Sequence, residues 1–250
     1  MQRARIDIKI MAVESRKEHA DSVLKEVMDN NTSKIIYDDK GINGGGNPWY
    51  NAKRCWLTDT DADYQMVIQD DAILCTDFLE YVYKCIAFNP MAIWSFYCPY
   101  KVTKKITKID ASTPYLQIVG NKLNGATILL PKKYARTIVE DTDYIFGEEY
   151  KHDDSRISWW SCYNKIPAFT TNPALVEQKT IKSTLAGHRG KGNSRFWIGK
   201  DVSKADWESK KYNKTPFVFP DLWMNEENAN YRKAYEYCQM AKRRAKEEWK

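Results

Sequence analysis

Apolar and polar residues alternate along the chain with two periods, and each period predicts a different element. Residues 5–13 alternate at a spacing of two, which is the pattern of a half-buried strand. Residues 17–29 place apolar side chains three and four positions apart, which predicts a helix with one buried face. The succession repeats twice, with strands expected at residues 34–37 and 64–68 and helices at 50–57 and 76–88. Such units in series predict an α/β fold with a mixed, mostly parallel central sheet and helices on both faces.

The second half of the chain carries fewer regular signals. Strands are expected at residues 92–97 and 126–130, and helices at 132–141 and 155–163, after which the chain becomes rich in loops. Residues 226–250 contain neither Gly nor Pro and are heavily charged, which predicts a charged C-terminal helix. We find no internal repeat and no linker, so the sequence predicts a single domain over residues 1–250.

The composition excludes several classes of protein. No apolar run approaches the roughly 18 residues that cross a bilayer, and the N-terminus carries charges where a secretion signal needs apolar residues. We therefore expect a cytoplasmic protein without a transmembrane segment. The six Cys are scattered without a Cys-x-x-Cys pair, which predicts free thiols. The glycines at residues 44–46 do not match a dinucleotide fingerprint, and residues 188–195 do not match a Walker A motif.

Positive charge is concentrated in one segment. The whole chain has a formal net charge of +6, whereas residues 179–214 alone hold ten Lys or Arg and three acids, a net charge of +7. The rest of the chain is therefore close to neutral. A local basic segment indicates a polyanionic partner, either a nucleotide diphosphate or a nucleic acid. The alternative is a solvated surface, because charge runs often mean no more than that.

An acidic pair follows the third predicted strand. Asp70 and Asp71 come directly after the apolar run at residues 66–68 and Gln69. Ligands of open α/β sheets bind outside the carboxyl ends of the strands, where two carboxylates can hold a divalent ion that bridges two phosphates. The alternative is an acidic turn that caps the following helix.

The pair and its surroundings resemble a known family. Residues 67–72, followed by Phe78 and Leu79, are similar to the "hydrophobic run, x-Asp-Asp-small" form of the acidic motif of GT-A-type nucleotide-sugar glycosyltransferases. This form is found in lipopolysaccharide and procollagen-type enzymes and in small bacteriophage-encoded relatives. The Pro-Ala-Leu-Val sequence at residues 173–176 resembles a late active-site segment of the family. The resemblance covers roughly residues 5–200.

The resemblance implies an enzyme that moves a sugar from a nucleotide-diphosphate sugar, such as a UDP-sugar, to an acceptor hydroxyl, on a GT-A-like, Rossmann-like fold. Residues 1–100 would bind the nucleotide sugar, residues 101–215 would bind the acceptor and carry the catalytic groups, and residues 216–250 would form a helical extension. The implied donor-binding residues at the strand ends are Val13, Glu14, Ser15, Arg16, Asp38, Asp39, Gln69 and Asp70.

The resemblance also implies Mn²⁺ or Mg²⁺ at the donor diphosphate, with Asp71 as a ligand. Relatives often carry a His that can bind the metal where this chain has Gln178. Because glutamine is a poor ligand, this departure puts metal dependence in question. His188 is the expected replacement, since it lies in the segment that follows.

The densest acidic cluster, residues 148–154, is where we expect a catalytic base. An inverting transfer needs a carboxylate to accept the proton of the acceptor hydroxyl, and acidic pairs at the start of a late helix serve this purpose in GT-A enzymes. Asp154 is the first candidate and Asp153 the second. The alternative is that these acids only stabilise the N-terminus of a helix. Trp159 and Trp160 follow a few residues later and are expected to stack on a sugar or base of the acceptor, although one of the two is also a candidate for the core.

A glycine- and cation-rich loop follows at residues 188–195. Glycine permits close approach of the backbone, and Arg and Lys bind phosphate oxygens. We expect Arg189 and Lys191 to contact the donor diphosphate, and Arg195 and Trp197 to contact the acceptor.

The acceptor is the least defined substrate. The surplus of cations favours DNA carrying a hydroxymethylated base, as in phage-encoded relatives, whereas the resemblance to lipopolysaccharide enzymes favours a saccharide. A non-catalytic nucleic-acid-binding module is the rival from another class. It leaves the acidic clusters unexplained, because carboxylates repel a polyanion. A metal-dependent nuclease would use the same acids, but no Asp-Glu-Lys constellation has a suitable spacing.

Overall fold

Three parallel strands form the N-terminal part of the sheet in the computed structural model, which describes residues 3–28, 32–39, 47–98, 113–120, 123–179, 194, 196–215, 217 and 219–249. The strand β1 (Ile6–Ala12) lies between β2 (Thr32–Tyr37) and β3 (Tyr64–Gln69) and is parallel to both. The connecting helices are α1 (Lys17–Val27), preceded by the 3-10 turn η1 (Glu14–Arg16), and α2 (Pro48–Trp56). Asn47 caps α2, because its side-chain oxygen accepts from the Tyr50 N–H at 3.2 Å.

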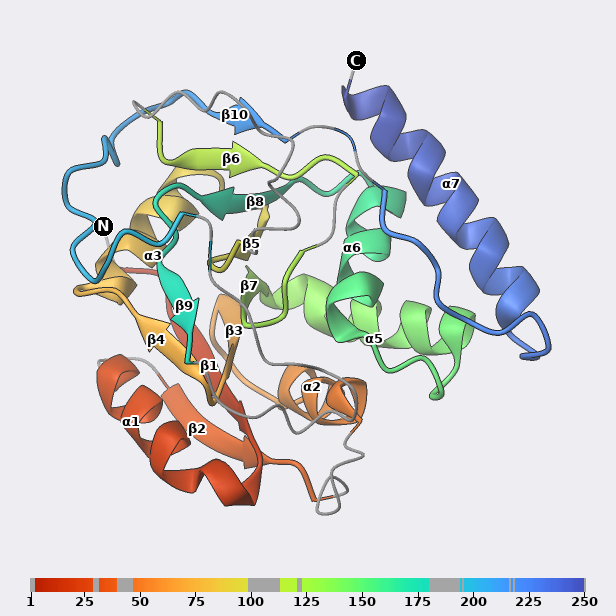
Figure 1. Cartoon of the computed structure of the whole chain (residues 1–250), viewed down its shortest axis with the longest axis horizontal. Helices are drawn as coiled ribbons and strands as arrows, with labels where there is room; N and C mark the ends of the chain where they lie inside the picture. Colours follow the sequence, from red (N-terminus) through yellow and green to blue (C-terminus); the bar gives the residue numbers. More distant parts are fainter. Residues whose placement is uncertain are drawn as a thin grey trace.

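Antiparallel strands enter the sheet beyond β3. There β7 (Thr127–Pro131) lies antiparallel between β3 and β5 (Ile93–Ser95), and β8 (Ala168–Thr171) is parallel to β5. The far edge consists of β6 (Tyr115–Gln117) and β10 (Asn213–Lys214). The eight strands among the described residues follow the order β10-β6-β8-β5-β7-β3-β1-β2 (Figure 1). The expected mixed, mostly parallel α/β sheet is therefore confirmed.

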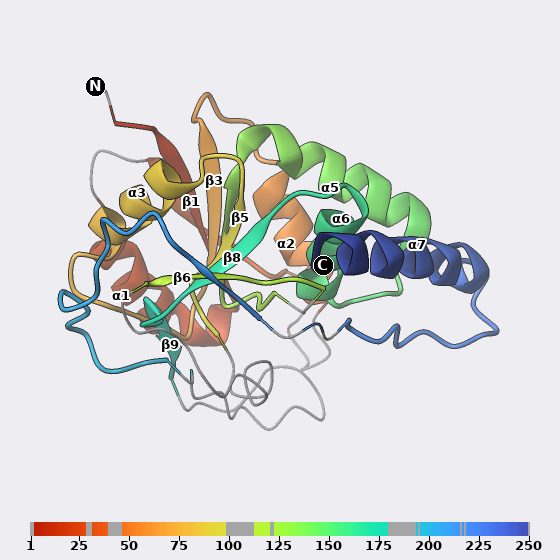
Figure 2. The ribbon, with the colours of Figure 1, turned by 90° about the horizontal axis from the view of Figure 1, so that it is seen from above.

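Helices cover both faces of the sheet, as Figure 2 shows. On one face, α1 and α3 (Phe78–Phe88) pack on the side chains of Ile6, Ile8 and Ile10. On the other, α2, α5 (Lys132–Phe146) and α6 (Asp153–Tyr163) pack on the opposite side of the strands. A helix on each face is the arrangement that buries a mostly parallel sheet.

The C-terminal helix α7 (Tyr231–Trp249) packs against α5 and α6. Its buried side chains recur three or four residues apart and are Ala234, Tyr237, Cys238, Ala241 and Ala245. The helix begins five residues later than the sequence predicts, because Asn225 and Asn228 make side-chain and backbone turns before it. All six cysteines are buried free thiols, as expected. Among the described residues, no helix is long and apolar enough to cross a membrane.

Candidate functional site

Asp70 joins the carboxyl ends of the neighbouring strands β1 and β3. Its Oδ2 accepts from the Val13 N–H at 3.1 Å, and its Oδ1 accepts from the Arg16 guanidinium at 3.0 Å. In the order of the sheet, β2 and β5 lie on opposite sides of the pair formed by β1 and β3. The chain therefore leaves β1 in one direction, towards β2, and leaves β3 in the other direction, towards β5. Connections that diverge from two adjacent parallel strands mark the crevice where open α/β sheets bind ligands.

The acidic pair is a turn that redirects the chain. After Gln69, residues Asp70 and Asp71 lead into the short strand β4 (Ala72–Leu74), which pairs antiparallel with β9 (Val176–Gln178) in a separate two-stranded sheet. The next helix, α3, begins only at Phe78. The alternative interpretation of the pair as a helix cap is therefore wrong.

Burial makes the two carboxyl groups unlike ordinary surface acids. Burial and the neighbouring Asp70 carboxylate raise the pKa of Asp71 to about 6, against the opposing effect of Arg16. Burial also raises the pKa of Asp70, again against the effect of Arg16. The Arg16 guanidinium lies 3.8 Å from Asp71 Oδ2 as well. One arginine therefore balances both acids at the centre of the crevice.

The residues around Asp71 fit a cation that is only partly held by protein. Asp71 Oδ1 is buried and has no hydrogen-bond partner among the described residues, so it offers a ligand. Both oxygens of Asp70 are already engaged. No group of three His, Cys, Asp or Glu side chains suited to a metal occurs within the described ranges, and His188 lies outside them. A single carboxylate suits Mg²⁺, which typically takes its remaining ligands from phosphates and water.

The end of β2 completes the same edge of the sheet. The Asp38 N–H donates to the Ala12 carbonyl at 2.8 Å, and Asp39 is exposed and pairs with Arg54 at 3.4 Å. Asn51 of α2 holds the two strand ends together, because its Nδ2 donates to the carbonyls of Ala12 and Ile36 at 3.3 and 3.2 Å. The structure thus brings residues 13–16, 38–39 and 69–71 to one edge. Asn51 was not predicted, because a polar residue within an amphipathic helix carries no positional signal.

The late segment around Pro173 runs beside the acidic pair. The Leu175 carbonyl accepts from the Cys75 N–H at 2.9 Å, and the Lys179 N–H donates to the Asp71 carbonyl at 2.7 Å. Lys179 Nζ lies 3.2 Å from His19 Nδ1. The segment therefore brings the backbone of Lys179 against Asp71 and its ammonium group against His19.

Two further side-chain contacts define this segment. Gln178 Nε2 donates to Gln69 Oε1 at 3.1 Å. Glu177 accepts the Ser194 N–H on both carboxylate oxygens, at 3.0 and 2.9 Å. Gln178 is thus held against the end of β3. The predicted metal ligand His188, the predicted phosphate-binding residues Arg189 and Lys191 and the predicted acceptor residue Arg195 lie outside the described residues.

The candidate base residues Asp153 and Asp154 are the first two residues of α6. A Cβ added at Gly125 would lie 3.0 Å from Asp153 Oδ2, so Asp153 packs against the chain just before β7. The next residue, Ala126, accepts the Gln69 N–H at 2.9 Å. Asp153 is therefore close to the end of β3. The N-terminus of α6 favours negative charge at both acids.

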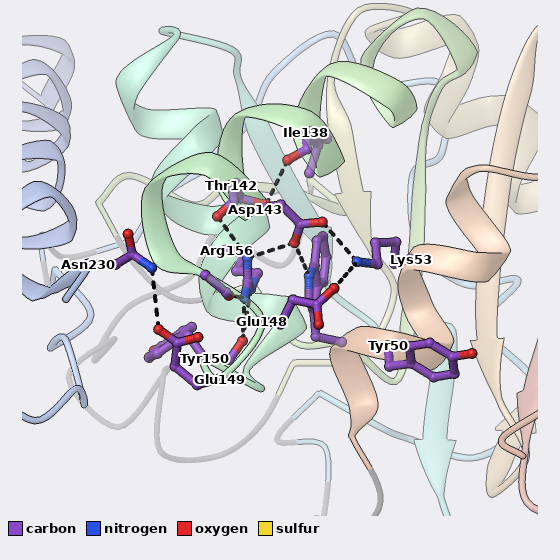
Figure 3. A network of polar contacts seen from close by, with 12 residues as sticks. Tyr50, Lys53, Ile138, Thr142, Asp143, Glu148, Glu149, Tyr150, Arg156 and Asn230 are labelled. Atoms are coloured by element: carbon purple, nitrogen blue, oxygen red, sulfur yellow. Dashed lines mark hydrogen bonds and ion pairs between the residues drawn. The ribbon is translucent and has the colours of Figure 1, made fainter. Parts of the chain in front are cut away.

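A buried arginine holds the loop that leads into α6 (Figure 3). Arg156 is fully buried, and its guanidinium donates to the Tyr150 carbonyl at 2.9 and 2.6 Å and to the Thr142 carbonyl at 2.8 Å. It also donates to the Gly147 carbonyl and to Asp143 Oδ1, the latter at 3.3 Å. Burial lowers the pKa of Arg156 to about 10, with Asp143 opposing the shift. The geometry of the acidic segment at residues 147–154 therefore depends on this side chain.

The expectation that Trp159 and Trp160 stack on an acceptor is wrong. Their exposed fractions are 0% and 3%. Trp159 Nε1 donates to the Pro220 carbonyl, and Trp160 Nε1 donates to Asp141. Every residue from 155 to 162 is buried, because α7 covers α6 as well. Trp197 is partly buried against the main core and keeps some accessible surface.

Comparison with known proteins assigns no family to this chain. It matches no protein-family model and no curated protein. Among solved structures, it is similar to mannose-6-phosphate isomerase from Helicobacter pylori at 10% identity, over 66% of this chain and 72% of that chain, with a TM-score of 0.31. A TM-score this low supports no inference about activity.

Proposed function

We propose that the chain is a glycosyltransferase that moves a sugar from a nucleotide-diphosphate sugar to an acceptor hydroxyl, on a GT-A-like variant of the α/β fold. The observation that carries the proposal is the contact of Asp70 with Val13 and Arg16, which joins the ends of β1 and β3 beside Asp71. Because the connections from these two strands diverge at this edge of the sheet, it is the expected ligand site.

The donor diphosphate would bind beside Asp71. Arg16 is a cation near this point, and its guanidinium can bind phosphate oxygens. Asp71 would hold Mg²⁺ or Mn²⁺ together with the diphosphate. Such an ion would supply positive charge against the departing diphosphate. Asp38 and Asp39 would face the nucleoside, since they end the neighbouring strand β2.

The acceptor would be activated by the acids that begin α6. Asp154, or Asp153 in its place, would accept the proton of the acceptor hydroxyl. The acceptor oxygen then forms its bond to the anomeric carbon. The bond from that carbon to the diphosphate oxygen breaks, and the nucleoside diphosphate leaves with the electron pair.

A thermal-shift screen of nucleotide sugars, with and without Mg²⁺ or Mn²⁺, tests the proposal. A donor at about 100 times its dissociation constant adds about 2.7 kcal/mol, which raises the melting temperature by roughly 5–11 °C for a chain of this size. Arg16→Met should abolish the shift, whereas Arg232→Met, at an exposed ion pair on α7, should leave it unchanged. No shift with any nucleoside diphosphate or its sugar would contradict the proposal.

A further inference from the structure

Trp223 is a large exposed aromatic side chain beside the candidate base. Its exposed fraction is 64%. Its ring centroid lies 5.2 Å from that of His152, edge to face, and His152 is the residue before Asp153. An indole ring is therefore accessible one residue away from the two acids that begin α6.

The backbone around Trp223 is anchored so that this ring points outward. The neighbours on both sides, Leu222 and Met224, pack against the cluster that contains Phe146 and Trp159. The Pro220 carbonyl accepts from Trp159 Nε1 at 3.3 Å. Because both neighbours point inward, Trp223 is held at the surface by the fold.

The surface that carries Trp223 is strongly acidic. The two segments that meet there, residues 147–154 and 219–230, hold seven Asp or Glu and one Lys. Of the cations below them, Arg156 is fully buried and Lys53 is paired with Asp143 and Glu148. Phosphate groups would be repelled here, whereas hydroxyl groups can donate hydrogen bonds to carboxylates.

In the described part of the basic segment, residues 179, 194 and 196–214, the aromatic side chains are less exposed than Trp223. Part of the segment packs beside α3, because the Lys200 carbonyl accepts from the Thr76 N–H at 2.9 Å and Glu208 pairs with Lys84. Phe196 and Trp207 have exposed fractions of 8% and 5%, Trp197 is partly buried, and Tyr212 is 45% exposed. Residues 219–230 run beside α6 and α7 and lead into α7 (Figure 2).

We propose that Trp223 and His152 form an acceptor subsite for a saccharide, whose sugar ring stacks on the indole while its hydroxyls donate to the surrounding carboxylates. The inference rests on the proposed function, since it names the class of acceptor that Asp154 would activate. It assigns the acceptor to carbohydrates instead of DNA, because the charge beside the candidate base favours hydroxyl donors and disfavours phosphates.

Ligand-observed NMR with the methyl glycosides of glucose, galactose, mannose and N-acetylglucosamine tests the subsite. At least one glycoside should bind, and Trp223→Ala should weaken it by about three- to tenfold, the loss expected for one stacked ring. Trp223→Phe should retain most of the binding, because it keeps an aromatic face. The matched control is Trp249→Ala, at the other end of α7 and 46% exposed, which should bind as the original protein does.

The subsite would be overturned if no glycoside binds, or if Trp223→Ala and the control Trp249→Ala lose binding equally. It would also be overturned if a duplex containing 5-hydroxymethylcytosine binds instead and Trp223→Ala weakens that binding. The donor screen keeps this test separate from the transferase proposal. Glycoside binding that depends on Trp223 without any donor binding would refute the transferase and leave a saccharide-binding site. Donor binding without glycoside binding would refute the subsite alone.

Discussion

Replacing Arg156 with Met tests how the acidic loop is held. The guanidinium is fully buried and donates to the carbonyl oxygens of Thr142, Gly147 and Tyr150 and to Asp143. The Cζ atom of the Arg156 guanidinium also lies 4.5 Å from the centre of the Trp49 ring. Methionine fills much of the same space but donates no hydrogen bond. The substitution therefore removes the polar contacts with little loss of apolar packing.

The expected loss follows from the groups left behind. Each buried carbonyl without a donor costs about 1–3 kcal/mol, and the cation–ring contact contributes up to about 2 kcal/mol. Part of this sum is offset, because the variant no longer has to bury a charged guanidinium. The cost of that burial is what lowers the pKa of Arg156. Removing one partner of a buried pair typically costs about 3–5 kcal/mol. We expect a loss in that range and a melting temperature lower by roughly 6–20 °C.

Urea denaturation followed by circular dichroism measures the loss. The midpoint for Arg156→Met should fall with an unchanged slope. Arg156→Lys should lie between the two proteins, since lysine keeps the charge but not the planar fork. Arg232→Met, at an exposed pair 3.9 Å apart, is the control and should change the free energy of unfolding by less than about 0.5 kcal/mol. A loss below about 1 kcal/mol for Arg156→Met would refute the assignment of Arg156 as the anchor of the loop.

Three further predictions concern the base, the late segment and the acceptor. Asp154→Asn should lower the transfer rate by roughly 10²–10⁴ with donor affinity unchanged; an equal loss of donor binding in calorimetry would return the role to Asp153. Burial raises the pKa of Glu177 above 4.5, so the folded state binds more protons just above that pH, and the free energy of unfolding should fall as pH rises through this window. Glu177→Gln should reduce this slope in denaturation curves, to which Asp70 and Asp71 also contribute because burial raises their pKa values; an unaltered slope would exclude Glu177 as a source. Acceptor binding should be insensitive to salt, whereas a slope of magnitude about three or more in log affinity against log salt would indicate a polyanion.

The edge of the sheet that forms the site could be predicted because its signals are local. The alternation in β1 and the apolar run in β3 are confirmed as parallel neighbours. Since carboxyl ends of parallel strands meet at one edge, residues 13–16 and 70–71 were expected to lie together. The contact of Arg16 with Asp70 could not be derived in this way, because it depends on the 3-10 turn after β1.

The parts that the sequence did not predict are those defined by long-range packing. The strand β8 has four buried residues, including Thr170 and Thr171, and therefore shows no alternation of apolar and polar positions. The helix α6 is buried on all sides between α5 and α7, so the nearby charges wrongly suggested a surface role for its tryptophans. Arg156 gave no signal, because an arginine in a sequence usually indicates solvent.

Release of nucleoside diphosphate from a nucleotide sugar tests the central claim most directly. Chromatography with a saccharide acceptor, in the presence of Mg²⁺ or Mn²⁺, should detect release by the original protein. Asp71→Asn should abolish the release, because it removes negative charge at the ends of β1 and β3, where the cation and the diphosphate would bind. The melting temperature should be preserved. Asp61→Asn, at a side chain 83% exposed, should release product at the original rate. Equal rates for Asp71→Asn and the original protein would contradict the account.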